Sequence, residues 1–150
     1  MSMKIEMGLE CDIDNWMNLV YKVKDYFPGL ETKEALDNHK NTVLEFMSQK
    51  SAICTKHDDK IIGVLLFSID NNELCFLAVD ENYRRQHIAD NMISYMLTFM
   101  DDKKDVVVTT YRKEVPEGIA ARAFYKSLGF QEGQLTEEFG SPVQKFVLKR

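Results

Sequence analysis

Three strand-like segments follow one another almost without interruption in the middle of the chain, and they constrain the fold more than any other feature. They are SAICTKH at 51–57, KIIGVLLFSID at 60–70 and ELCFLAV at 73–79. Asp58-Asp59 and Asn71-Asn72 separate them, and Asp and Asn tolerate the positive φ that tight hairpin turns require. The pattern therefore predicts three strands joined by two hairpins.

The next two segments change the way in which strands are connected. Residues 86–101 repeat apolar side chains at helical spacing, and DVVVTTYR at 105–112 is typical of a buried strand. A helix between two strands of one sheet makes a crossover connection. The strands at 73–79 and 105–112 should therefore be parallel.

The flanking segments complete the element order. We expect a first strand at 3–10, then two helices with apolar faces at 13–23 and 31–49, separated by Pro28-Gly29. A later helix begins at Pro116 and ends near Leu128, and GQLTEEF and PVQKFVLK form a final antiparallel pair. The predicted order is βααβββαβαββ, an α/β (α+β) fold with a mixed, mostly antiparallel central sheet flanked by helices.

Composition places the chain among globular proteins. With 150 residues, 45% of them hydrophobic, we expect one domain over 1–150, and a net charge of −5 argues against nucleic acid. The first ten residues lack the apolar segment of a secretory signal, and no apolar run is long enough to cross a bilayer. Three widely spaced cysteines are interpreted as reduced thiols of a cytoplasmic protein, and the three histidines lie at no metal-ligand spacing, so no metal is expected.

The stretch DENYRRQHIAD at 80–90 places two arginines where a strand gives way to a helix. A helix N-terminus offers unpaired backbone N–H groups and a partial positive charge, so the junction suits phosphate, and a pyrophosphate would satisfy several donors at once. Alternatively, Arg84 and Arg85 are solvated charges paired with Asp80, Glu81 or Asp90. The local residues leave both interpretations open.

Two segments also resemble a known family. LAVDENYRRQHIADNMISYML at 77–97 is similar to the acetyl-CoA-binding motif of the GCN5-related N-acetyltransferase (GNAT) superfamily, which has Arg or Gln, two variable residues, Gly, one variable residue, then Gly or Ala at this turn. AARAFYKSLGF at 120–130 resembles the second recognisable segment of that superfamily. The predicted element order matches the same fold over essentially the whole chain. The residues at the motif positions are Arg84, Arg85, Gln86, His87, Ile88 and Ala89.

The resemblance implies that acetyl-CoA is a co-substrate whose acetyl group passes directly to an amine, without a covalent enzyme intermediate. Residues 84–89 would hold the pyrophosphate. Leu77, Ala78 and Val79, at the splayed end of the fourth strand, would pair with the pantetheine arm, and a backbone N–H near Val79 would polarise the thioester carbonyl. Ala121 completes the expected coenzyme-binding set.

Two residues are candidates for proton transfer. The resemblance implies that the Tyr125 hydroxyl protonates the departing thiolate, and the alternative is a core aromatic with a solvated hydroxyl. Glu73 resembles the strand-entry glutamate that serves as base in the histone-acetylating branch, and strand alternation would put it on one face with Leu77 and Val79. The alternative for Glu73 is a polar residue that ends a turn. Cys75 is interpreted as a packing residue.

His87 and Gly118 depart from the family pattern. His87 stands where relatives have a glycine whose backbone approaches the pyrophosphate; it would either point outward, leaving its N–H usable, or contact a phosphate itself. Gly118 occupies the place where many relatives have an asparagine near the pantetheine arm. The departures motivate two rival hypotheses, a non-catalytic acyl-CoA-binding sensor or regulatory module and an interaction domain that has lost coenzyme binding.

The resemblance implies that the acceptor is an amine. Acidic residues near the cleft would attract a cationic amine, unless they are only solvated surface charges. A monomer or a homodimer is expected, and the last strand, FVLK at 146–149, should be exposed and able to pair across subunits. The candidate acceptor residues are Asp25, Tyr26, Phe27, Glu31, Glu34, Glu137, Glu138 and Phe139.

Overall fold

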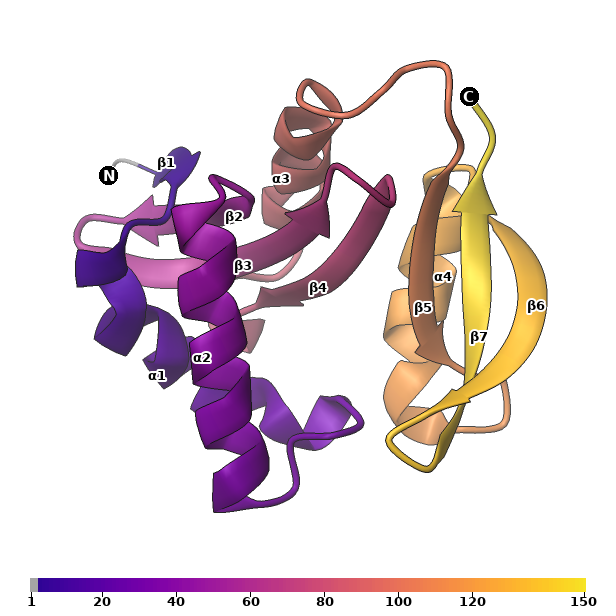
Figure 1. Cartoon of the computed structure of the whole chain (residues 1–150), viewed down its shortest axis with the longest axis horizontal. Coiled ribbons are helices and arrows are strands. Elements are labelled where there is room, and N and C mark those ends of the chain that lie inside the picture. Colours follow the sequence, from indigo (N-terminus) through magenta and orange to yellow (C-terminus); the bar gives the residue numbers. More distant parts are fainter. Residues whose placement is uncertain (1–2) are drawn as a thin grey trace.

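A mixed sheet of seven strands runs through the protein in the computed structural model, which describes residues 3–150 (Figure 1). The strands lie in the order β1-β2-β3-β4-β5-β7-β6, and every neighbouring pair except β4 and β5 is antiparallel. Their bounds are β1 Met3–Met7, β2 Ala52–His57, β3 Lys60–Ser68, β4 Glu73–Val79, β5 Val106–Tyr111, β6 Gln131–Glu138 and β7 Ser141–Leu148.

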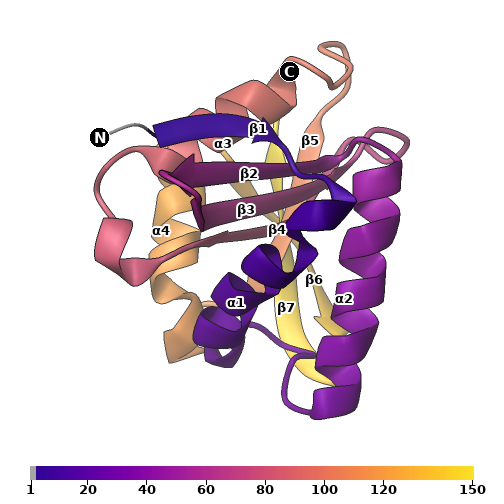
Figure 2. The ribbon, with the colours of Figure 1, turned by 90° about the vertical axis from the view of Figure 1, so that its left-hand side faces the viewer.

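Helices cover both faces of the sheet, and Figure 2 separates α2 from α4 on opposite sides of it. The α-helices are α1 Ile13–Val23, α2 Lys33–Ser48, α3 Ile88–Leu97 and α4 Ile119–Ser127. Short 3-10 turns lie at η1 Glu10–Asp12, η2 Lys24–Tyr26, η3 Glu81–Tyr83 and η4 Pro116–Gly118. The element order is the predicted one.

Each face of the sheet buries a separate apolar core. Helices α1 and α2 pack one core around Trp16 and Val43, both of which have no exposed surface. Helices α3 and α4 pack the other core around residues such as Met92 and Phe146, which are equally inaccessible. Burying one side chain of this size contributes about 1.5–3 kcal/mol, so both cores stabilise the sheet from opposite sides.

The order of the last two strands corrects one prediction. FVLK belongs to β7, which lies between β5 and β6, so the last strand is internal and β6 forms the edge. The side chains explain the order, because β7 buries Val143 and Phe146 while the residues of β6 are almost all exposed. Pairing across subunits through FVLK is therefore wrong.

The parallel pair β4 and β5 confirms the predicted crossover but is very short. Only Glu73 with Val107 and Leu74 with Val108 are paired, and beyond them the two strands diverge (Figure 1). Asn72 holds the paired ends of β4 and β5 together. Its amide Nδ2 donates to the carbonyl oxygens of Lys104 and Asp105 at 3.1 and 3.2 Å.

Further bonds strengthen the attachment of Asn72. Its Oδ1 accepts the Asp101 N–H at 3.2 Å, and its backbone oxygen accepts the Val107 N–H at 3.2 Å. The side chain is buried, and the backbone adopts φ 50°, which Asn tolerates. One residue of the predicted turn thus ties β4 to the connection between α3 and β5.

Replacing Asn72 by Asp tests this attachment while keeping the size and turn preference of the side chain. A buried carboxylate would face carbonyl oxygens in place of a donor, so the free energy of unfolding should fall by about 3 kcal/mol. Urea denaturation at pH 7 measures the change, with Asn71→Asp at the exposed neighbouring position as the control. Equal and small losses in the two variants would contradict the role given to Asn72.

Candidate active site

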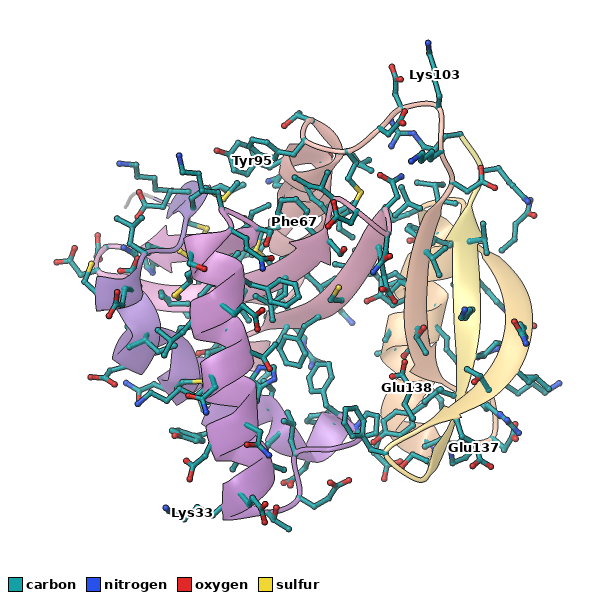
Figure 3. All side chains as sticks on the ribbon, viewed as in Figure 1. Lys33, Phe67, Tyr95, Lys103, Glu137 and Glu138 are labelled. Carbon is teal, nitrogen blue, oxygen red and sulfur yellow. The ribbon has the colours of Figure 1, made fainter. Side chains whose placement is uncertain are left out.

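The divergence of β4 and β5 opens a cleft of about 580 Å³. This volume lies within the range of pockets that bind small ligands. One wall comes from β4 and the end of α1, and the other comes from β5, α4 and the β6–β7 hairpin. Figure 3 shows Glu138 pointing into the gap between the two halves.

Strand β4 presents free backbone donors to this cleft. Its Asp80 end is fixed by an N–H bond to the Ile62 oxygen of β3 at 2.8 Å. Backbone N–H groups alternate in direction along a strand, so those of Leu77 and Val79 point away from β3. Because β5 no longer pairs with β4 at these positions, both groups face the cleft.

A β-bulge at Cys75 changes which side chains share a face of β4. Leu66 of β3 lies opposite Phe76, while its neighbour Phe67 lies opposite Leu74, so Cys75 is the extra residue. Leu74 consequently packs in the core that α3 and α4 cover, whereas Phe76 packs on the opposite face, in the core that α1 and α2 cover.

The bulge corrects the prediction for Glu73. Glu73 neighbours Leu74 and so lies on the face of Phe76 and Ala78, not on that of Leu77 and Val79, and it is not among the residues that line the cleft. Burial, and then the charge of Glu138, raise the pKa of Glu73, although Lys145 opposes the shift. Cys75 is exposed and lines the cleft, so its interpretation as a packing residue is also wrong.

The turn between β4 and α3 presents a run of backbone N–H groups. Within residues 3–150, the amides of residues 85–90 have no hydrogen-bond partner, whereas that of Arg84 donates to the Glu81 oxygen at 3.5 Å. Arg85 and His87 both adopt positive φ, 66° and 59°. Alternation of this kind turns successive N–H groups toward one concavity, which suits an anion.

The two arginines of this turn are free to face such an anion. Both are exposed, and neither forms an ion pair with the described residues. Asp80 pairs instead with Lys22 at 3.3 Å, and Asp90 faces the His87 ring at 3.4 Å. The alternative in which Arg84 and Arg85 pair with these carboxylates is therefore wrong.

His87 occupies the helix N-cap with a left-handed backbone, which explains why a glycine suits this position. Its side chain is 79% exposed and turns toward Asp90, one turn along α3. The ring therefore leaves the backbone amide uncovered. Gln86 is not among the residues that line the cleft.

Most of the predicted coenzyme-binding residues line the cleft. From the strand these are Leu77, Ala78 and Val79, from the turn Arg84, Arg85, His87, Ile88 and Ala89, and from α4 Ala121.

Tyr125 reaches the cleft from the buried side of α4. Its side chain is buried, and its ring lies 5.6 Å from those of Phe124 and Phe130. Burial raises the pKa of Tyr125 well above its ordinary value, so the hydroxyl keeps its proton. A protonated donor is thus held at the edge of the cleft.

Packing explains why residue 118 is a glycine, and the sequence alone did not reveal this. A Cβ at Gly118 would lie only 2.6 Å from the Cβ of Tyr111, so no asparagine fits there. Tyr111 itself lines the cleft at the end of β5, and its position after the buried strand was the only sequence signal for it. Burial, then Glu31 and Glu117, raise the pKa of Tyr111.

Comparison with known proteins identifies the class. The model of the acetyltransferase (GNAT) family matches residues 16–130, and the chain belongs to this family. This match confirms the predicted family and an acetyl-CoA-dependent acyltransferase, and it favours the enzyme over the two rival hypotheses. None of the curated proteins compared with the chain matches it.

Solved structures show the same fold. A GNAT acetyltransferase from Bacillus cereus ATCC 10987 is 17% identical with a TM-score of 0.76, covering 100% of this chain and 99% of that one. The PaiA N-acetyltransferase from Thermoplasma acidophilum, in complex with coenzyme A, is 15% identical with a TM-score of 0.71 and coverage of 97% and 98%. An N-acetyltransferase from Staphylococcus aureus Mu50 is 15% identical with a TM-score of 0.74, covering 96% of this chain and 99% of that one.

Neither a membrane helix nor a metal cluster emerges from residues 3–150. Their helices are all too short or too polar to cross a bilayer. The same residues include no group of three His, Cys, Asp or Glu side chains placed to hold a metal ion.

Asp80 links the end of β4 to the anion-binding turn, and its charge should stabilise the fold. Burial alone would raise the pKa of Asp80, but the Asn82 N–H and the ammonium groups of Lys22 and Lys60 lower it below its ordinary value. Asp80→Asn should therefore lower the free energy of unfolding by about 2 kcal/mol at pH 7.

The difference in stability between the wild type and Asp80→Asn should depend on pH. Because the pKa of Asp80 is lower in the folded protein, its charge stabilises the fold at pH values above the unfolded pKa of about 3.9. This contribution disappears as the pH falls through the folded pKa. Denaturation curves of the two proteins should therefore converge below about pH 4. Glu81→Gln, an exposed neighbour, is the control, and a difference that persists unchanged into acid would contradict the assignment.

Proposed function

We propose that the protein transfers the acetyl group of acetyl-CoA directly to a primary amine of a cationic acceptor. One observation carries the proposal. The free amides of residues 85–90 and the protonated Tyr125 belong to opposite sides of the same cleft. Unpaired donors and an open strand edge fit the pyrophosphate and the amide-bearing arm of coenzyme A.

The coenzyme end of the cleft uses main-chain groups. Arg84 and Arg85 add charge to the amides of the turn, and charge-assisted bonds to phosphate are stronger than neutral ones. The N–H groups of Leu77 and Val79 would bind the pantetheine arm and orient the thioester carbonyl. Bound acetyl-CoA supplies an activated acyl group on a thiol leaving group.

The reaction needs an acid for the departing thiolate and a base for the amine. Tyr125 holds a proton on its hydroxyl oxygen that can pass to the thiolate sulfur as the amine nitrogen bonds to the acyl carbon. The amine must be neutral when it attacks. Glu138 is a carboxylate at the acceptor end of the cleft, and it would accept the proton of the amine.

The acceptor end has the opposite charge from the coenzyme end. Glu117 and Glu138 line it, while the cleft's cationic lining residues are confined to the turn after β4. A cationic amine is therefore favoured over an acidic acceptor. We further propose a single domain over 1–150, monomeric or homodimeric, in a reducing cytoplasm that suits its three free cysteines.

Thiol release from acetyl-CoA with a panel of amines tests the proposal. Wild-type protein should release coenzyme A with some cationic amine, and Tyr125→Phe should lower kcat about 100-fold. Because burial raises the pKa of Tyr125, kcat should not decline on the alkaline side below about pH 10. The control is Tyr95→Phe, which changes a tyrosine on α3 far from the cleft (Figure 3).

Two results would count against the proposal. Full turnover by Tyr125→Phe would remove the general acid. A coenzyme A-induced rise in Tm without thiol release for any amine would favour a sensor.

A further inference from the structure

Two loops from opposite sides of the cleft meet at its acceptor end. One is the connection between α1 and α2, with Pro28-Gly29, and the other is the turn between β6 and β7, with Phe139. Figure 1 shows both loops extending toward each other beneath the gap between β4 and β5. A Cβ placed on Gly29 would lie 2.7 Å from Cγ and Cδ2 of Phe139, so the ring rests directly on the glycine.

The conformation of Phe139 is unusual for a surface aromatic residue. Its backbone has φ 52°, a region that bulky side chains rarely adopt, and 77% of the residue is exposed. The two-residue turn Phe139-Gly140 requires positive φ at both positions, and a bulky aromatic residue is an uncommon choice for such a turn. Gly29, on which the ring rests, also has a positive φ of +84°, and its N–H donates to Glu31 Oε1 at 3.1 Å.

The contact lies at the rim of the cleft rather than elsewhere on the surface. Phe27 and Pro28, which precede Gly29, line the cleft, as does Glu138, which precedes Phe139. The Phe139–Gly29 contact therefore bridges the two halves that diverge at β4 and β5. Because most of the ring remains in solvent, separating the contact exposes little apolar surface, so it can open.

We propose that Phe139 is a specificity-determining residue, which closes the acceptor end of the cleft against Gly29 and favours small amines over lysine side chains of a protein or peptide. The inference rests on the proposed amine acetylation and names the size class of its acceptor. A small amine reaches the cleft past the closed contact, whereas a peptide must hold the two loops apart.

The first test compares two acceptors, 1,4-diaminobutane and a short unstructured peptide carrying one lysine. Phe139→Ala should raise the ratio of kcat/KM for the peptide to that for the diamine about fivefold or more. Phe139→Trp, which keeps a flat ring, should leave the ratio unchanged. So should Leu135→Ala, since Leu135 is an exposed apolar residue of the same hairpin, paired with Gln144 on the face that carries α4.

The second test needs no catalysis and uses Cys75, the exposed thiol that lines the cleft. In a Cys11→Ser background the remaining cysteine, Cys54, is buried and should not react. Alkylation rates are measured with iodoacetamide and with bulky fluorescein maleimide. The same thiolate attacks both reagents, so the raised pKa of Cys75 cancels in the ratio of the two rates.

Phe139→Ala should raise the ratio of the maleimide rate to the iodoacetamide rate about fivefold or more, and Leu135→Ala should not change it. Equal ratios in all three proteins would overturn the proposal, as would a wild type that prefers the peptide. If wild-type protein acetylates no amine of the panel, the proposed function fails on its own, and the Cys75 ratio still decides whether Phe139 closes the cleft.

Discussion

The parallel pairing of β4 and β5 stops after two residue pairs, and the rest of the site depends on that interruption. Asn72 holds the paired end closed through its buried amide, so the strands separate in one direction only. Unpaired strand edges are usually a liability because they recruit other strands. In this protein the unpaired edge of β4 lies inside a cleft, where a second chain cannot easily pair with it.

In the proposed function, much of the binding chemistry belongs to the main chain. The amides of residues 85–90 are unpaired because a left-handed Arg85 and a left-handed His87 lead directly into α3. This arrangement depends on backbone conformation, so a histidine can stand where relatives have a glycine provided that its side chain turns away, as it does toward Asp90. The charge of the two arginines then reinforces a site that the backbone defines.

The sequence predicted the features that arise from local chemistry. Period-two and helical patterns gave the element order, and Asp58 and Asn72 marked turns because each adopts positive φ. It could not predict the bulge at Cys75, because a register shift depends on the partner strand, and Glu73 was consequently placed on the wrong face. Nor could it predict that Tyr111 fills the space beside Gly118, since this contact depends on the path of the chain between β5 and η4.

The central claim is that main-chain amides along one splayed strand and one helix N-terminus bind coenzyme A. Amide proton–nitrogen correlation spectra recorded during titration with coenzyme A test it directly. The largest shifts should fall on residues 85–90, with Leu77 and Val79 next, while the exposed face of α2 stays unchanged. Shifts spread evenly over the protein, or confined to residues outside the cleft while those amides do not move, would contradict the account.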